Sequence, residues 1–557
     1  MSANGFLTAV QSHDWFTENG AVSHSTTGDA LLDYFSKSGT YSGREPIEVA
    51  ADLSRAWADS PQMTLMTVFY NRMISRSPNG FADIGSVQSG QGMRDEFRKA
   101  LGWMHVAHPD VLYANLWLVP VVGTWKDLWH ADTVETLDAQ QVYQLVERGL
   151  GDDYNRPLIA KYLPRIRSKS KIKNPHHLAL NKWARGLCEH LGWTEREYRR
   201  FKSNPANEAH LWQRCMCAGQ WDQINFDAIP GKAMFKLNNN TGEDGVGALE
   251  RHAKAEVTEW AQSADTIKFT GHVYDLVKAS KNARFLQRTV IDKQFDGLIE
   301  LAQKDREGLT ENIWCALDTS GSMGMEAVAG TSAFDICVGM GVYFSTLNTG
   351  AFHNQVIMFD EISRTLSING SFTDKVQQIN ASTTAWGSTN FQSVIDEIVR
   401  VRSQNPDIPV EDFPTTLLVV SDMQFNPSQP TGSHSYFGNN PDASVDVSAA
   451  ETNHETAMRK LADAGLPPMR VIWWNVNARG TDFPSKFDDA GTIMISGFDG
   501  SIISLLLGGE PPANPEAVEE DIDPIVGDGP LPMTATPVDA MLKALDQPVL
   551  QLLEASV

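Results

Sequence analysis

Oxygen-bearing side chains lie on three loops of the C-terminal half in an arrangement that suits a hard cation. Asp318, Ser320 and Ser322 lie in DTSGS, directly after the apolar run IWCAL. Thr389 lies in GSTNF before a helical pattern, and Asp422 directly follows the apolar run LLVVS. Because loops at the carboxyl ends of parallel strands gather at one edge of a sheet, we expect these five side chains to converge.

Such a set of oxygens favours Mg²⁺, which takes about six oxygen ligands in an octahedron and readily keeps water in some positions. Mn²⁺ and Ca²⁺ accept similar ligands, so the pattern does not choose among the three ions. A simpler interpretation is that Asp318 and Ser320 only cap the following helix. A metal hydrolase is disfavoured because no general base stands beside these residues in the sequence.

The same stretches resemble a known metal site. DTSGSM, the G-S-T loop and VVSD are similar to the metal-ion-dependent adhesion site of von Willebrand factor A domains, whose five positions correspond here to Asp318, Ser320, Ser322, Thr389 and Asp422. The resemblance implies a bound divalent ion whose open position takes a carboxylate from an acidic protein partner.

The surrounding sequence predicts the elements that position these residues. From about residue 311, runs rich in apolar and β-branched residues alternate with helical patterns. Strands are expected at IWCALD, QVIMFD, TTLLVV and MRVIWW, and helices at SAFDICVGMGVYFSTL, FQSVIDEIVRVR and ETAMRKLADAG. This alternation predicts a Rossmann-like α/β domain over residues 306–508, with a parallel sheet covered by helices on both faces.

The apolar residues of the N-terminal half follow a different pattern. Apolar residues recur at helical spacing in LLDYFSKSG, MTLMTVFYNRMI, DEFRKALGWMHVA, QQVYQLVERGL and FDGLIELAQK. Helices with short connections must stack on one another to bury their apolar faces, so residues 1–305 are predicted to form an all-α domain. Residues 509–557 are expected to be an acidic Pro- and Gly-rich linker followed by a C-terminal helix, and residues 426–453 a long surface insertion.

Basic residues concentrate in one part of this helical half. The run KYLPRIRSKSKIKNPHH and the nearby TEREYRRFK stand out in a chain whose formal net charge is −23. Cationic side chains neutralise phosphates, and an aromatic face such as that of Tyr198 stacks on a base. The alternative is a solvated surface without a ligand. The candidate RNA-binding residues are Lys161, Arg165, Arg167, Lys169, Lys171, Lys173, His176, Arg199, Arg200 and Lys202.

Further stretches resemble the TROVE module of Ro autoantigen RNA-binding proteins and a related uncharacterised plant, viral and phage family. The resemblance implies a ring of HEAT-like helical pairs that binds single-stranded ends of structured or misfolded RNA. The stretches are TENGAVSHSTTGDALLDYF (residues 17–35), VFYNRMISRS (68–77), GQGMRDEFRKAL (90–101), VGTWKDLW (122–129) and QRCMCAGQWDQINFDAIPGKAM (213–234).

Composition argues against several other classes of protein. The negative net charge argues against coating of nucleic acid by the whole surface, and five cysteines in 557 residues do not form a disulfide framework. The sequence shows no apolar run long enough to span a bilayer and no secretory leader. We therefore expect a cytoplasmic protein, or a virion component if the source is viral, without a membrane partner.

Catalytic motifs are absent from the sequence as well. It contains no phosphate-binding loop of the G-x-x-x-x-G-K-[ST] type, no H-E-x-x-H and no G-x-S-x-G, so neither a nucleotide cofactor nor an enzyme is expected. The leading hypothesis is a Ro-like RNA-binding protein with a metal-dependent partner site. The alternatives are a structural or adhesion protein, such as a virus or phage particle component, and an adaptor for an assembly ATPase.

Overall fold

The structure is a computed structural model of the 557-residue chain. It describes residues 15–17, 19–40, 44–74, 90–130, 132–203, 211–241, 245–269, 271–305, 312–328, 330–383, 387–410, 413–427, 452–476, 483–497, 531 and 534–555. Most of the expected insertion at 426–453 and most of the expected linker after Gly508 lie outside these residues.

The chain divides into two compact units, each discontinuous in sequence. Unit 1 contains residues 1–40, 230–512 and 526–543, and unit 2 contains residues 41–229, 513–525 and 544–557. The expected boundary between residues 305 and 306 therefore falls inside unit 1. The assignment of residues 1–305, 306–508 and 509–557 to three domains stays a prediction, as does the closure of the helices into a ring.

Unit 1 is built around a six-stranded sheet with the strand order β10-β9-β8-β3-β6-β7. Starting from β3 in the middle, the chain adds β6 and β7 on one side, then returns to add β8, β9 and β10 on the other. The order of additions thus reverses between β3 and β8, which is where α/β sheets open a crevice for a ligand. The strands are β3 (Ile313–Asp318), β6 (Gln355–Phe359), β7 (Arg364–Ser367), β8 (Thr416–Ser421), β9 (Arg470–Asn475) and β10 (Thr492–Ser496).

The four strands expected from apolar runs are confirmed, but the sheet is mixed rather than parallel. β3, β6, β8, β9 and β10 pair in parallel, whereas β7 runs antiparallel to β6. The short turn between β6 and β7 leaves no room for the crossover that a parallel pair requires. The sequence analysis missed β7 and β10.

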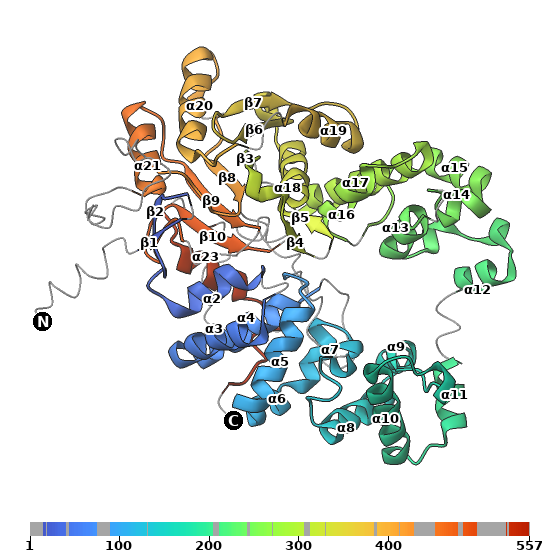
Figure 1. Ribbon diagram of the computed structural model, residues 1–557. Helices are drawn as coiled ribbons and strands as arrows, with labels where there is room; N and C mark the ends of the chain where they lie inside the picture. Colours follow the sequence, from blue (N-terminus) through green and yellow to red (C-terminus); the bar gives the residue numbers. More distant parts are fainter. Residues whose placement is uncertain are drawn as a thin grey trace, which may run out of the picture. The chain divides into compact units, whose positions relative to one another are not determined.

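Helices cover both faces of this sheet. α18 (Ala333–Leu347) connects β3 to β6, and α21 (Asn453–Asp463) connects β8 to β9 in the opposite direction across the sheet. Right-handed crossovers therefore place them on opposite faces, with α20 (Phe391–Gln404) beside α21 (Figure 1). α18 lies very close to β3, because a Cβ added at Gly341 would come within 2.5 Å of a methyl group of Leu317.

Unit 1 also includes helices from the half of the chain that we expected to be separate. α16 (Val273–Ser280) and α17 (Phe285–Asp305) pack against α18 and α19 (Phe372–Ser382), and the rings of Phe295 and Phe372 stack with centroids 4.4 Å apart. The apolar face of α17 is thus buried on the α/β domain. The other unit 1 elements are β1 (Trp15–Phe16), β2 (Val22–Ser23), α2 (Ala30–Ser38), α13 (Gly231–Asn239), α14 (Ala248–His252), α15 (Lys254–Ser263), η7 (Gly321–Gly324), β4 (Glu326–Val328), β5 (Thr331–Ser332) and η8 (Gly350–Phe352).

Unit 2 is helical throughout its described part, as its sequence periodicity predicts. Its helices pack mainly on their neighbours in sequence, for example α3 on α4 and α5. They are α3 (Pro46–Asp59), α4 (Pro61–Arg72), α5 (Asp95–Ala107), α6 (Pro109–Ala114), η1 (Leu116–Leu118), α7 (Val119–Val122), η2 (Trp125–Trp129), α8 (Ala139–Leu150), α9 (Asn155–Tyr162), η3 (Lys169–Lys171), α10 (Pro175–His190), α11 (Glu195–Ser203), α12 (Leu211–Ala218), η5 (Trp221–Gln223) and η6 (Phe226–Ala228).

The C-terminal helix predicted from the sequence is α23 (Pro537–Leu545), which ends before Pro548. A proline in the helix interior would remove a backbone hydrogen bond and clash with the preceding turn. Within the described ranges, no helix combines the length and the apolar character that crossing a membrane requires.

Three sequence stretches that resemble the TROVE module meet at a buried ion cluster in unit 2. Arg72 of α4 and Arg98 of α5 each donate two hydrogen bonds to the carboxylate of Asp127 in η2, at 2.8–3.1 Å. Burial raises the pKa of Asp127, but the two guanidinium charges outweigh burial and bring the pKa below its usual value. The cluster therefore fixes three elements around one charge.

We predict that Asp127→Ala lowers the free energy of unfolding by about 3–5 kcal/mol, because it leaves two buried guanidinium groups without their counter-ion. Chemical denaturation followed by circular dichroism measures the change. The control is Asp95→Ala, which removes an exposed carboxylate 3.1 Å from Arg98 and should cost no more than about 1 kcal/mol. Equal effects of the two substitutions would contradict the stabilising role of the cluster.

Candidate metal site and basic surface

The candidate metal site begins at the end of β3, the central strand of the sheet. Asp318 is fully buried, and its two carboxylate oxygens are held from two sides. Oδ1 accepts a hydrogen bond from the backbone N–H of Ser320 at 2.8 Å, and Oδ2 accepts one from Ser421 Oγ at 2.5 Å. Because Ser421 ends β8, this bond joins the two strands between which the order of the sheet reverses.

The second carboxylate follows β8. Asp422 is buried, and the next residue, Met423, has a positive φ of 66° although it is not glycine. A residue with a side chain in this left-handed region costs on the order of 1–2 kcal/mol. The Met423 N–H donates to Ser421 Oγ at 3.0 Å, so the same hydroxyl contacts Asp318 and holds the strained turn. Strain of this kind concentrates at functional sites.

The third loop brings Thr389 to the same edge. Gly387, which begins the described part of this loop, accepts a hydrogen bond from the N–H of Gly321 at 3.3 Å. The Thr389 carbonyl accepts one from the N–H of Asn426 at 2.8 Å. The Thr389 side chain is buried, and its Oγ1 has no hydrogen-bond partner among the residues that the structure describes. A buried hydroxyl without a partner is a costly arrangement that a bound cation would relieve.

The electrostatics of the site also favour a cation. Burial, and after it the charge of Asp422, raise the pKa of Asp318 to about 7, although hydrogen bonds from Ser421 and Ser320 act in the opposite direction. Two buried carboxylates of the same charge are therefore close enough to repel one another. A divalent cation between them would remove both the repulsion and much of the desolvation cost.

The hydroxyls have a spacing that suits the same ion. Ser320 Oγ and Ser322 Oγ lie 3.2 Å apart, and two adjacent ligands of an octahedral Mg²⁺ at ~2.1 Å are about 3 Å apart. Ser320 is buried, Ser322 is half-buried and the neighbouring Gly321 is exposed, which leaves one side open to water or to a partner. These residues therefore fit a divalent metal.

The structure thus brings together the loops that carry Asp318, Ser320, Ser322, Thr389 and Asp422. Among the described residues, no three His, Cys, Asp or Glu side chains gather as a metal-binding group. The candidate site differs from such a group because three of its five oxygens are hydroxyls, and the assignment of the metal stays a prediction.

Sequence reasoning missed three residues at this edge of the sheet. Ser421 is the hydrogen-bond donor to Asp318 described above. Asp360 is buried directly after β6, and its carbonyl accepts from the N–H of Asn390 at 2.8 Å. Cys337 of α18 lies beneath the site, with its Sγ 3.7 Å from the Asp318 carbonyl oxygen. The position of Asp360 after an apolar strand was the available signal, and the other two depend on packing.

Side-chain amides support the Thr389 loop from behind. Gln392 of α20 donates to the carbonyl and side-chain oxygens of Asn453, each at 2.9 Å, and Asn453 Nδ2 donates to the Asn426 carbonyl at 2.9 Å. The next residue, His454, lies against Trp473, and its Nδ1 is buried without a hydrogen-bond partner in the described part of the chain. The start of α21 is thereby tied to the loop that carries Thr389.

The candidate RNA-binding residues lie on α9, α10, α11 and the segments that join them, all within unit 2. Lys202 of α11 donates through Nζ to the carbonyl oxygens of Ala160 and Lys161, at 3.2 and 3.3 Å. Burial and the charge of Arg165 lower the pKa of Lys202 to about 8. These contacts bring Lys161, Arg165 and Lys202 together where α9 ends.

A second group of cations surrounds the start of α10. Asn181 binds the backbone of Arg167 twice, through Oδ1 at 2.9 Å and Nδ2 at 2.8 Å. Burial lowers the pKa of His176, and the neighbouring His130, His177 and Arg167 lower it further. Arg167 and His176 are therefore neighbours, and the charge of Asp132 opposes these effects by raising the pKa of His176.

The structure places most of these side chains at the surface. Arg167, His176 and Lys202 are half-buried, and the side chain of Lys169 lies outside the described part of the chain. Arg199 pairs with Glu195 at 2.6 Å, which reduces its availability to a phosphate. The exposed members of the set are Lys161, Arg165, Lys171, Lys173, Arg199 and Arg200.

The expected stacking role of Tyr198 is wrong. Its ring is fully buried, and its hydroxyl donates to the Pro164 carbonyl at 2.8 Å. Tyr198 thus anchors α11 to the segment that carries Arg165, and its aromatic face is not open to a base.

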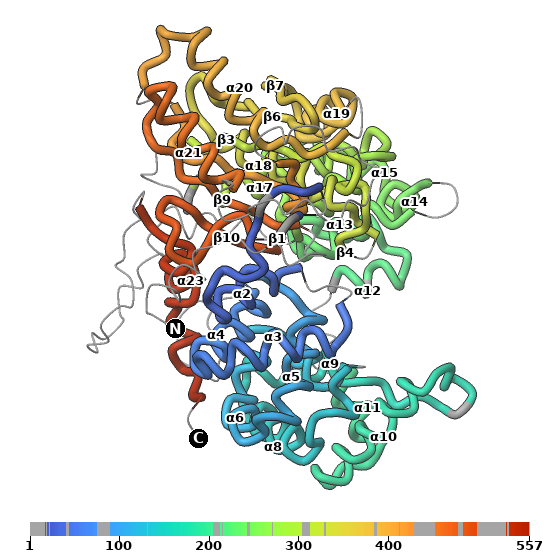
Figure 2. The backbone as a smooth tube through the Cα atoms, turned by 60° about the vertical axis from the view of Figure 1, so that its left-hand side comes forward, coloured from blue at the N-terminus to red at the C-terminus, as the bar shows by residue number. Residues whose placement is uncertain are grey.

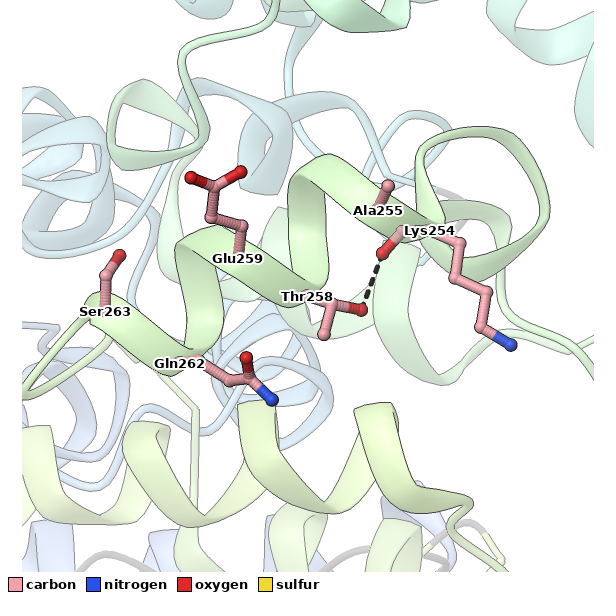
Figure 3. Close-up of a pocket in the computed structure, with 6 residues that line it drawn as sticks. All are labelled: Lys254, Ala255, Thr258, Glu259, Gln262 and Ser263. Carbon is pink, nitrogen blue, oxygen red and sulfur yellow. Dashed lines mark hydrogen bonds between the residues drawn. The ribbon is translucent and has the colours of Figure 1, made fainter.

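A further hollow in the surface lies along α15. Figure 3 shows its lining residues, which all belong to this one helix, and a hydrogen bond of 2.6 Å from Thr258 Oγ1 to the Lys254 carbonyl. The hollow brings together no residues from separate elements, so it carries no chemistry comparable to the strand-end site.

The chain thus combines two parts. One is a doubly wound α/β sheet with a cluster of oxygen ligands at the ends of its strands, and the other is a helical unit with a basic surface. Two families match parts of it: "Domain of unknown function (DUF7788)" over residues 313–545 and "Domain of unknown function (DUF2828)" over residues 17–149. Both matches include residues described above.

Individual relatives are distant. The chain is 22% identical over 531 residues to "Uncharacterized protein L728" of Acanthamoeba polyphaga mimivirus, which covers 89% of this chain and 85% of that protein. Among solved structures, the chain is similar to the RO (RSR) protein of Deinococcus radiodurans, with 16% identity and a TM-score of 0.35 over 89% of this chain and 97% of that one.

We predict that His454 makes the protein less stable as the pH falls below the ordinary pKa of histidine. Burial lowers the pKa of His454 to about 4, whereas the unfolded chain keeps a pKa of about 6.5. The unfolded state therefore binds more protons between pH 6.5 and 4, and stability declines in that window as the pH falls.

Urea denaturation at pH 7.5 and 5.5 tests this prediction. The wild type should lose roughly 1 kcal/mol more stability over this interval than His454→Leu, because only the wild type carries the buried imidazole. Identical pH dependence in the two proteins would show that His454 does not titrate as its burial predicts.

Proposed function

We propose that this protein binds single-stranded or misfolded RNA through unit 2, and that unit 1 binds Mg²⁺ and, through the metal, an acidic protein partner. The proposal describes binding rather than catalysis. It follows from two chemically different surfaces, one rich in cations and one rich in oxygen ligands.

The observation that carries the RNA part is a stretch of sequence that contains Lys and Arg but no carboxylates. No Asp or Glu occurs between Asp153 and Glu189, although the whole chain has a net charge of −23. Arg165, Lys171 and Lys173 lie in this stretch with exposed side chains. Lys and Arg that neutralise phosphates release condensed counterions, and this release supplies most of the affinity of non-specific RNA binding.

The fixed backbone of this region supports the same proposal. Trp129 Nε1 donates to the Tyr162 carbonyl at 3.1 Å, and Tyr198 binds the Pro164 carbonyl. Asn181 holds the backbone on both sides of Arg167. The cations are therefore presented from a backbone that is already ordered, which lowers the entropy cost of binding. The resemblance to the TROVE module is in agreement with an RNA ligand.

The metal part rests on the strand-end site. Asp318, Ser320, Ser322, Thr389 and Asp422 would hold the ion, with Mn²⁺ or Ca²⁺ as alternatives to Mg²⁺. The ion would act as a Lewis acid for an oxygen ligand from outside. If RNA binding fails while metal binding persists, the adhesion function, in which the metal binds an acidic protein and the helices serve as scaffold, becomes the better explanation.

The RNA proposal predicts binding whose affinity falls with salt. We expect a labelled single-stranded RNA to bind the full-length protein, and Lys171→Glu with Lys173→Glu to weaken binding at least 10-fold. Because single-stranded RNA releases about 0.7 counterion per phosphate contact, the slope of log K against log salt should become less steep by about 1.4. Fluorescence anisotropy at several salt concentrations measures both quantities.

The matched control is Lys126→Glu, which reverses an exposed charge of η2 in the same unit. It should change the affinity much less and leave the slope nearly unaltered. Absence of salt-dependent binding by the wild type would eliminate the RNA function, and equal effects of both variants would place the RNA elsewhere.

The metal proposal predicts that Asp318→Ala abolishes Mn²⁺ binding measured by calorimetry while the far-ultraviolet circular dichroism spectrum stays unchanged. The reason is that Asp318 contributes a buried carboxylate from the central strand. Asp396→Ala removes an exposed carboxylate of α20 in the same unit and should bind Mn²⁺ like the wild type. An unaltered affinity of Asp318→Ala would exclude this site.

A further inference from the structure

The N-terminal hairpin lies beside the strand ends of unit 1, far from its own position in the sequence. β1 and β2 pair antiparallel, with Trp15 opposite Ser23 and Phe16 opposite Val22. Figures 1 and 2 both show this blue segment beside the orange strands β9 and β10. His24 and Phe483 exchange two backbone hydrogen bonds of 3.0 and 3.1 Å, so the hairpin is attached to the sheet domain at a defined register.

The turn of this hairpin is shaped by local interactions. The N–H of Thr17 donates to the Ala21 carbonyl at 2.9 Å, and the N–H of Ala21 donates to Thr17 Oγ1 at 3.0 Å. Gly20 has a φ of 87°, a conformation that glycine adopts without steric cost. The turn therefore holds Thr17 and Asn19 in fixed positions.

Both residues reach the loop that follows Asp422. Thr17 Oγ1 donates to the Phe425 carbonyl at 2.6 Å, and Asn19 Nδ2 donates to the Gln424 carbonyl at 2.5 Å. Thr17 and Phe425 are 408 residues apart in sequence. The two accepting carbonyls belong to residues one and two positions after Met423, whose left-handed backbone places Asp422 at the strand end.

We infer that the N-terminal hairpin positions the metal site, with Thr17 and Asn19 holding the Asp422 loop in its strained conformation. This inference rests on the metal function proposed above. The hydrogen bonds satisfy the carbonyls of the two residues that follow Met423. Neither residue touches the ion, and each acts by fixing where the Asp422 carboxylate lies.

The neighbouring contacts show why the loop needs this support. On one side, the loop is tied to the Thr389 carbonyl through the N–H of Asn426 and to Asn453 Nδ2 through the Asn426 carbonyl. Both bonds are made by Asn426, which follows the strained Met423 in sequence, and they connect this loop to the Thr389 loop. On the other side, the carbonyls of Gln424 and Phe425 are bound by the hairpin. The loop is therefore held between two ligand-bearing regions.

The test is Mn²⁺ affinity of the full-length protein, measured by the electron paramagnetic resonance signal of free Mn²⁺. Thr17→Val keeps the shape of the side chain and removes the hydroxyl that donates to Phe425 and accepts from Ala21, and we expect the dissociation constant to rise roughly 3- to 10-fold, the value of one net hydrogen bond. Thr17→Ser retains the hydroxyl and should restore wild-type affinity. Asn19→Ala should weaken binding in the same direction.

The control is Ser23→Ala, which removes a 2.9 Å hydrogen bond from the same hairpin to the Phe483 carbonyl, away from the Asp422 loop. It should leave the affinity unchanged, and thermal unfolding in chelator identifies any variant that fails to fold. Wild-type affinity in both Thr17→Val and Asn19→Ala would overturn the inference while the metal function stands. Equal weakening by Ser23→Ala would also overturn it, and no Mn²⁺ binding by the wild type would overturn both.

Discussion

The arrangement of unit 1 depends on one constraint: two buried carboxylates of the same charge lie close together at the point where the order of the sheet reverses. Asp318 ends the central strand and Asp422 follows its neighbour, so the strand pairing itself forces them together. Burial and mutual repulsion disfavour this arrangement unless the charges are compensated. A bound cation would account for three features of this site together. They are the hydroxyl of Ser421, the hydroxyl of Thr389, which has no partner among the described residues, and the strained backbone of Met423.

In unit 2, the charges that lie close together are positive rather than negative. Residues 154–188 contain no Asp or Glu, and the charge of Arg165, which lies in this stretch, contributes to the lowered pKa of Lys202 on α11. The order of this region comes instead from neutral hydrogen bonds, such as those of Asn181 and Tyr198 to the backbone. By contrast, the cluster around Asp127 binds its cations internally, which shows that only some Arg residues of this unit are available to a ligand.

Sequence patterns predicted the parts of the fold that depend on local periodicity. The apolar runs located β3, β6, β8 and β9, and their polar ends located the candidate metal ligands, because a strand end is visible in the sequence. The antiparallel edge strand β7, the support from Ser421 and the packing of α17 on α19 depend on contacts between distant segments, which no local pattern encodes. Tyr198 illustrates the same limit, since an aromatic residue in a basic run can serve the core as readily as a ligand.

The discontinuity of unit 1 has a consequence for how the protein is made. The hairpin around Thr17 is synthesised before the rest of unit 1, yet its acceptors, the carbonyls of Gln424 and Phe425, are synthesised some four hundred residues later. Residues 41–229 of unit 2 are synthesised between these two segments. Helical segments dominated by contacts between neighbours form quickly, whereas long-range strand pairings form slowly. The helices of unit 2 therefore have time to fold during translation, and the Asp422 loop reaches its final geometry only after residues 41–229 have been synthesised.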